Sequence, residues 1–268
     1  MTNSCILKTI DDFELSIMHT EAKGKAVVLW LHGITVDKNE YLNFFKEGSQ
    51  YLEALGVDSL RIDFRGHGES SGTSLDFSIV GQMMDVEAAL NYLNQRYSEK
   101  GFTLYIVGCS FGAAPAIFAA LRWPKIVKNI ILIAPVLSYI RTFIQPETEW
   151  GQSIFNVLAL SKMEKTKKLY INDDFPISIR LVEEMRLIDP LVALKQLKQG
   201  VTIIHGDADS MVPYDVSKQA ASAMSTVKLF TFKNMDHGFT DVDDEIGTSL
   251  KSQENKKRIY DIISEICR

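Results

Sequence analysis

Short apolar runs alternate with longer segments of helical period along almost the whole chain of 268 residues. Continuous apolar strands are typical of a parallel sheet that helices cover on both faces. Their alternation with helices predicts an α/β layered architecture with right-handed crossovers. The expected strands are 26–31, 58–62, 103–107, 130–134, 201–204 and 228–232, and the expected helices are 41–54, 78–97, 111–122, 214–224 and 249–266.

Two segments depart from this alternation. Residues 4–9 and 13–20 alternate apolar and polar side chains, which predicts an N-terminal hairpin. Between 137 and 190 the sequence has helical patches and a lysine-rich run at 162–168 but no convincing strand. Long connections without strands are uncommon in compact domains unless they are functional. We therefore expect one domain over 1–268, with a small helical cap at about 137–190.

Composition excludes several classes of protein. The formal net charge is −5 with acids and bases mixed along the chain, so no basic face for nucleic acid is expected. Three cysteines form no disulfide framework, and the first twenty residues lack the apolar core of a secretory signal. The longest apolar stretches are too short to span a bilayer. These features predict a reduced, soluble, cytoplasmic protein with no stable membrane insertion.

The central chemical signal is Gly108-Cys109-Ser110-Phe111-Gly112, a match to G-x-S-x-G. It follows an expected strand and begins an expected helix, which is the place of a nucleophile elbow. Glycines beside the serine allow the close backbone approach that such a strained turn requires. Ser110 is therefore the candidate nucleophile, and Cys109 is interpreted as a small buried packing residue.

A serine nucleophile needs a base to take its proton. His237 follows the last core strand, so it lies at the same carboxyl edge of the sheet as Ser110. We assign it as the base. The other four histidines are interpreted as a surface residue (His19), structural hydrogen-bonding residues (His32 and His205) and a loop-shaping residue (His67).

The orienting acid should lie between the serine and the histidine in the chain, after a strand. Asp207 and Asp209 both satisfy this requirement. Asp209 lies deeper in the turn, whereas Asp207 is placed to bond the turn's own backbone. Spacing alone leaves both aspartates open.

An oxyanion hole needs two backbone donors where negative charge develops. One is expected from Phe111, the residue after the nucleophile. The other is expected from the turn after strand 26–31, where Gly33 lets the chain bend and aim the amide of Ile34 inward.

Several motifs in this order resemble the α/β-hydrolase superfamily. They are Leu31-His32-Gly33, Asp63 to Ser70 (DFRGHGES), the serine elbow, His205 to Asp209 (HGDAD) with Val212-Pro213, and Asp236 to Phe239 (DHGF). Within it, the chain is similar to bacterial cinnamoyl/feruloyl esterases and to monoacylglycerol lipases. The resemblance implies an α/β-hydrolase fold with a mostly parallel eight-stranded sheet, an acyl-enzyme and no cofactor or metal. It also implies that Asp209 is the triad acid. The cap matches no family pattern.

The expected activity is hydrolysis of carboxylic esters with small to medium acyl or aryl-acyl groups. A thioesterase or acyltransferase would use the same triad, as would a cofactor-free haloperoxidase or a carbon–carbon hydrolase. A non-catalytic binding protein of the same fold is a further alternative. The expected partner is a small ester, and a homo-oligomer through the cap remains open. Five aromatic residues could line the acyl pocket or form the cap's own core: Phe111, Phe143, Trp150, Phe155 and Tyr170.

Overall fold

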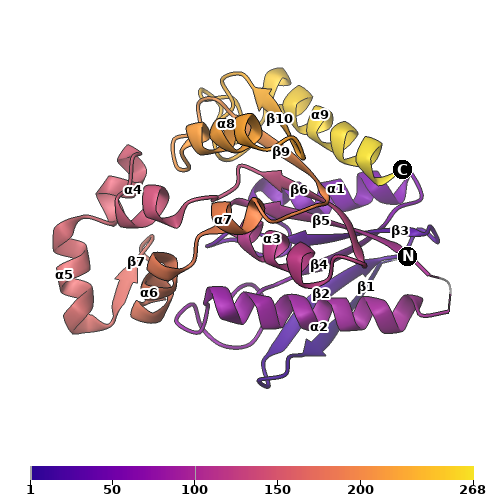
Figure 1. Ribbon diagram of the computed structural model, residues 1–268, viewed down its shortest axis with the longest axis horizontal. Coiled ribbons are helices and arrows are strands. Elements are labelled where there is room, and N and C mark those ends of the chain that lie inside the picture. Colours follow the sequence, from indigo (N-terminus) through magenta and orange to yellow (C-terminus); the bar gives the residue numbers. More distant parts are fainter. Residues whose placement is uncertain (1, 100) are drawn as a thin grey trace.

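An eight-stranded sheet lies at the centre of the computed structural model, which describes residues 2–99 and 101–268 (Figure 1). Its strand order within these residues is β1-β2-β4-β3-β5-β6-β9-β10. The pairs β1·β2 and β2·β4 are antiparallel, and all the other pairs are parallel. The prediction of a mostly parallel eight-stranded sheet with an N-terminal hairpin is therefore confirmed.

The elements lie within a few residues of the expected ranges. The strands of the sheet are β1 (Thr2–Lys8), β2 (Glu14–Thr20), β3 (Ala26–Leu31), β4 (Asp58–Ile62), β5 (Thr103–Cys109), β6 (Val127–Ile133), β9 (Gly200–Gly206) and β10 (Val227–Phe232). The helices outside the cap are η1 (Tyr41–Asn43), α1 (Phe44–Glu53), α2 (Ile79–Tyr97), η2 (Ser110–Gly112), α3 (Ala113–Arg122), α8 (Tyr214–Ala223) and α9 (Leu250–Cys267).

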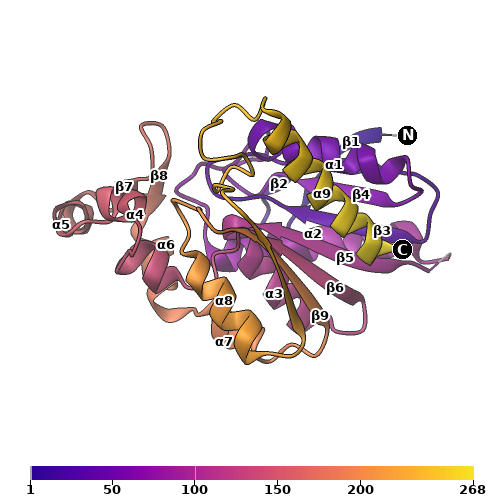
Figure 2. The same ribbon diagram turned by 90° about the horizontal axis from the view of Figure 1, so that it is seen from above.

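Helices cover both faces of the sheet. Figure 2 shows α1 and α9 on one face and α3 and α8 on the other, and α2 packs beside α3. Successive side chains of a strand point to opposite faces. In β3, Val28 and Trp30 pack in the α1/α9 cluster, whereas Leu29 and Leu31 pack in the larger cluster opposite. Both sets are fully buried, which explains why the strand reads as an unbroken apolar run.

The segment between β6 and β9 forms a lobe at one end of the sheet (Figure 1). It is mostly helical, with the π-helical turn η3 (Ile140–Ile144), α4 (Glu149–Ile154), α5 (Val157–Thr166), α6 (Ile179–Leu187) and α7 (Pro190–Leu194). The prediction that it contains no strand is wrong, because β7 (Lys168–Tyr170) and β8 (Pro176–Ser178) form an antiparallel pair. Strands of three residues are too short to produce a readable alternation.

His19 is the second correction. It was expected at the surface, yet its residue is only 1% exposed. Its ring nitrogens lie 2.9 Å from the hydroxyl oxygens of Tyr92 and Tyr97 on α2. A polar side chain can be buried in this way when both of its nitrogens find partners.

Candidate active site

Ser110 stands at the turn between β5 and α3 with a positive φ of 49°. Such a backbone costs a non-glycine residue about 1 kcal/mol or more, so the surroundings must hold it. A Cβ on Gly108 would come within 2.5 Å of the carbonyl oxygen of Gly112, and one on Gly112 within 2.2 Å of that of Leu31. The two glycines therefore allow the tight contacts that keep Ser110 at the sharp turn.

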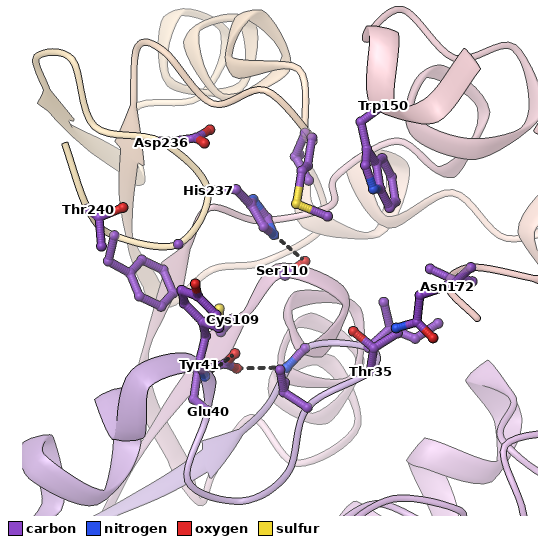
Figure 3. A pocket seen from close by; sticks show the side chains of 18 of the residues that line it. Thr35, Glu40, Tyr41, Cys109, Ser110, Trp150, Asn172, Asp236, His237 and Thr240 are labelled. Atoms are coloured by element: carbon purple, nitrogen blue, oxygen red, sulfur yellow. Dashed lines mark hydrogen bonds between the residues drawn. The ribbon is translucent and has the colours of Figure 1, made fainter. Parts of the chain in front are cut away.

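Ser110, His237 and Asp209 form a continuous hydrogen-bonded chain. The Oγ of Ser110 lies 3.0 Å from Nε2 of His237, a contact drawn in Figure 3. The Nδ1 of His237 lies 2.8 Å from Oδ2 of Asp209. Because a carboxylate only accepts, Nδ1 of the neutral imidazole carries the proton and Nε2 is free to accept the serine proton. The structure thus brings together three residues that lie up to 127 positions apart.

The carboxylate of Asp209 is held from every side, and its side chain is only 1% exposed. Oδ1 accepts the amides of Met211 and Val212 at 2.9 and 2.8 Å. Oδ2 also accepts a hydrogen bond from Nε2 of His205 at 3.0 Å. Burial opposes ionisation, but the positive charge that His237 carries when protonated, with the hydrogen bonds from both histidines, lowers the pKa of Asp209 below its usual range. The acid is therefore ionised and rigidly oriented.

Asp207 points elsewhere. Its Oδ1 accepts the backbone amide of Asn234 at 2.7 Å, and the residue is exposed. It ties the turn after β9 to the turn after β10, rather than bonding its own turn as expected. Among the described residues, the structure places Asp209 and not Asp207 against His237.

The turn after β3 packs directly against the nucleophile. A Cβ on Gly33 would lie 3.3 Å from Cβ of Ser110, a tight contact that glycine avoids. Ile34, the next residue, lines the cavity above Ser110. Phe111 is fully buried under the elbow and does not line that cavity with its side chain. Both expected oxyanion donors therefore belong to segments adjacent to Ser110.

A cavity of about 390 Å³ opens above Ser110 and His237 (Figure 3). Of the described residues, no lysine or arginine lines it, but three acidic ones do: Glu40, Asp236 and Glu245. In Figure 3, Trp150 and Asn172 of the cap segment lie on one side of the cavity, with Thr35 beside Asn172, and Tyr41 lies on the other side near Glu40 and Cys109. Within residues 2–99 and 101–268, no cluster of three or more His, Cys, Asp or Glu side chains could hold a metal ion.

The five aromatic candidates for the acyl pocket divide into two groups. Phe143 and Trp150 line the cavity. Phe155 is buried against Phe143, Phe111 is fully buried in the core, and Tyr170 is 48% exposed. The lysines of α5 lie on its exposed surface. None of the helices in the described part of the chain has the length and apolar character that a bilayer span requires.

Three other predicted residues fill structural roles. His32 bonds the carbonyl of Gly33 at 2.6 Å, and its Nε2 accepts the amide of Phe64 at 3.0 Å. His67 packs edge-on against Phe77 and lies beside His32. Cys109 is buried, and burial raises the pKa of its thiol well above the ordinary value, so the thiolate is disfavoured.

Sequence reasoning missed two residues of the site. His205 was assigned a structural hydrogen bond, but its Nε2 donates directly to Asp209. Its Nδ1 lies 2.7 Å from the hydroxyl oxygen of Ser217, which orients the ring. Glu40 was not considered at all, although it lines the cavity beside Cys109. The only signal for His205 is its position two residues before the paired aspartates, and none marks Glu40.

One protein family and several solved structures match this chain. The model of the Hydrolase_4 family, described as serine aminopeptidase, S33, matches residues 22–243. Est1E from Butyrivibrio proteoclasticus with bound ferulic acid is similar at 21% identity and a TM-score of 0.74, covering 97% of this chain and 99% of that one. A putative hydrolase from Agrobacterium vitis S4 is similar at 17% identity and a TM-score of 0.78, covering 100% and 99%.

One curated relative is named as an acetyltransferase. Ethanol acetyltransferase 1 from Cyberlindnera jadinii is 28% identical over 163 residues, which is 59% of this chain and 43% of the relative. The chain thus matches less than half of that relative's length. The solved structures, all at low identity, establish the fold only.

Proposed function

Because the chain belongs to the Hydrolase_4 family of serine aminopeptidase type, we propose that it is a serine hydrolase of carboxylic esters. Its substrates carry small to medium acyl or aryl-acyl groups, and Ser110 forms an acyl-enzyme with them. The observation that carries the proposal is the hydrogen-bonded chain from Ser110 through His237 to Asp209, which opens into the cavity. Triads are recognised by such geometry rather than by sequence position.

The proposed reaction has two steps. Ser110 attacks the ester carbonyl while Nε2 of His237 takes its proton, and the carbonyl oxygen becomes an oxyanion held by the amides of Ile34 and Phe111. The tetrahedral intermediate collapses as His237 returns the proton to the leaving alcohol. Water then attacks the acyl-enzyme in the same manner and releases the acid. Asp209 keeps its charge throughout and stabilises the imidazolium.

We also propose that the insertion at about 137–190 acts as a cap within a single domain of residues 1–268. Phe143, Trp150, Ile171 and Asn172 all come from this segment and line the cavity. An apolar wall with a few polar groups is typical of small-molecule sites. The cap therefore supplies part of the surface that selects the acyl or alcohol group.

The first experiment is hydrolysis of p-nitrophenyl esters from acetate to dodecanoate, together with labelling by a fluorophosphonate. We expect turnover with an optimum at short to medium chains, since the cavity volume is about 390 Å³. The fluorophosphonate is expected to modify Ser110, which peptide mass spectrometry identifies. A protein that neither hydrolyses any ester nor takes up the probe would refute the proposed function.

The acidic side chains that line the cavity favour uncharged esters over anionic substrates such as coenzyme A thioesters. With three carboxylic side chains and no lysine or arginine among the described lining residues, the cavity disfavours anionic substrates. We expect mono-p-nitrophenyl adipate to show a kcat/KM at least about tenfold below that of the hexanoate ester, from Coulomb repulsion of a few kcal/mol at most. Glu245→Gln should reduce the difference in kcat/KM between the two esters. Equal kcat/KM values for the two esters with the wild type would contradict the charge argument.

Acyl transfer to an alcohol is a second candidate, which the resemblance to ethanol acetyltransferase 1 favours. A transferase would use the same acyl-enzyme and differ only in the acceptor of the second step. The test is to add ethanol to the ester assay and to measure ethyl ester against free acid by chromatography. Ethyl ester in excess of the molar share of ethanol would favour transfer over hydrolysis.

The pH dependence follows from the surroundings of His237. Burial favours the neutral ring, but the charge and hydrogen bond of Asp209, with the charges of Glu40 and Asp236, outweigh it and raise the pKa of His237. The base must be neutral to accept a proton, so kcat/KM should fall as the pH drops through this raised pKa. We expect an acid limb above about pH 6.5, measured over pH 5 to 9. A midpoint well below 6 would contradict this environment.

A further inference from the structure

Glu40 is a buried carboxylic side chain in the cavity that takes part in no bond-making or proton-transfer step of the proposed reaction. Its residue is 8% exposed, and its backbone has a φ of 61° and a ψ of 169°. Positive φ is sparsely populated by residues other than glycine and persists only where surrounding contacts enforce it. Contacts that enforce this backbone are therefore expected around Glu40.

Both carboxylate oxygens of Glu40 accept backbone hydrogen bonds. Oε2 lies 2.8 Å from the amide nitrogen of Gly33, and Oε1 lies 3.0 Å from that of Tyr41. Cys109, the residue before the nucleophile, lies beside the same carboxylate and lines the cavity with it. One side chain thus joins the turn after β3 to its own loop and lies beside the elbow, as Figure 3 shows for Glu40 and Cys109.

The contact with Gly33 acts on the turn that carries Ile34. Gly33 lies between two groups, since its amide is hydrogen-bonded to Oε2 of Glu40 at 2.8 Å and a Cβ placed on it would lie 3.3 Å from Cβ of Ser110. The hydrogen bond from Glu40 fixes the peptide between His32 and Gly33, and the carbonyl of Gly33, which belongs to the next peptide, lies 2.6 Å from Nδ1 of His32. With one end of Gly33 held by Glu40 and the other by His32, the peptide that carries the Ile34 amide has little freedom to rotate. The direction of the Ile34 amide is therefore coupled to the carboxylate of Glu40.

We propose that Glu40 is a positioning residue for the oxyanion turn, holding Gly33 so that the Ile34 amide points at the developing oxyanion. This inference rests on the proposed function, because it assigns the Ile34 amide a role in ester cleavage. Burial raises the pKa of Glu40, against the effect of the hydrogen bonds from Gly33 and Tyr41. Ionised or protonated, the group retains an acceptor for Gly33. Glutamine can therefore replace much of its action.

The test compares Glu40→Ala with Glu40→Gln in the p-nitrophenyl ester assay. Loss of one oxyanion donor costs about 10²–10³ in rate, and partial misplacement costs less. We expect Glu40→Ala to lower kcat about 30- to 100-fold with KM changed less than about threefold. Glu40→Gln should recover at least about tenfold of this loss. Glu47→Gln is the matched control, because Glu47 is an exposed residue of α1 that does not line the cavity, and its kcat should equal that of the wild type.

Several outcomes would overturn the proposal. They are a kcat for Glu40→Ala within threefold of the wild type, a loss confined to KM, or a glutamine variant as impaired as the alanine variant. If Glu40→Ala does not fold, Glu40→Asp takes its place, since the shorter side chain withdraws the carboxylate from Gly33. A wild type that neither turns over esters nor labels at Ser110 would refute the proposed function, whereas an active wild type with an unaffected alanine variant refutes only the role of Glu40.

Discussion

Replacing Ser110 with alanine is expected to lower ester turnover by about 10⁴-fold or more without unfolding the protein. The hydroxyl is the atom that forms the acyl-enzyme, so its removal leaves only the binding and oxyanion contributions to catalysis. Stability should change by about 1 kcal/mol or less, because alanine fits the space of serine and only one side-chain hydrogen bond, to His237, is lost.

The measurement is kcat/KM with the best p-nitrophenyl ester, alongside thermal unfolding of both proteins. Ser98→Ala is the matched control, since Ser98 bonds the carbonyl of Gln95 at the exposed end of α2 and lies outside the cavity. The control should retain full activity and full fluorophosphonate labelling, and Ser110→Ala should lose both. Full activity in the Ser110→Ala variant would show that Ser110 is not the nucleophile.

Much of this fold could be predicted because its signals are local. The expected strand 103–107 is followed within six residues by Gly108, Ser110 and the start of a helix. The structure places Ser110 at that junction of strand and helix. Strands buried on both faces are read as apolar runs, as β3 illustrates. The position of His237 near Ser110 could be predicted because the carboxyl ends of parallel strands share one edge of the sheet.

The contacts that were missed depend on residues distant in sequence. His19 is buried only because α2, more than seventy residues later, places two tyrosine hydroxyls against it. Glu40 gains its contacts from a turn seven residues earlier and lies beside Cys109 at the end of β5 (Figure 3). The β7·β8 pair is too short for a period to be read. In each case tertiary packing, rather than local preference, determines where the side chain lies.

The choice between the two aspartates leads to the second large effect. Asp209→Asn is expected to lower kcat by about 10⁴-fold, whereas Asp207→Asn should change it by no more than a few-fold. An amide at 209 no longer stabilises the imidazolium, and its NH₂ group competes with Nδ1–H of His237 and so favours the wrong tautomer. Asp207 only ties one turn to Asn234, and an amide oxygen can still accept that hydrogen bond.

Kinetics and pH profiles of the two variants separate a catalytic effect from a loss of structure. Asp209 is the largest favourable charge on His237, so its neutralisation should lower the pKa of the base and move the acid limb of kcat/KM to lower pH. Asp207→Asn is the matched control, with the same chemical change two residues away, and should leave the limb in place. If Asp207→Asn were instead the more damaging substitution, the role of orienting acid would pass to Asp207, and the hydrogen bond between Asp209 and His237 would have to be explained as structural.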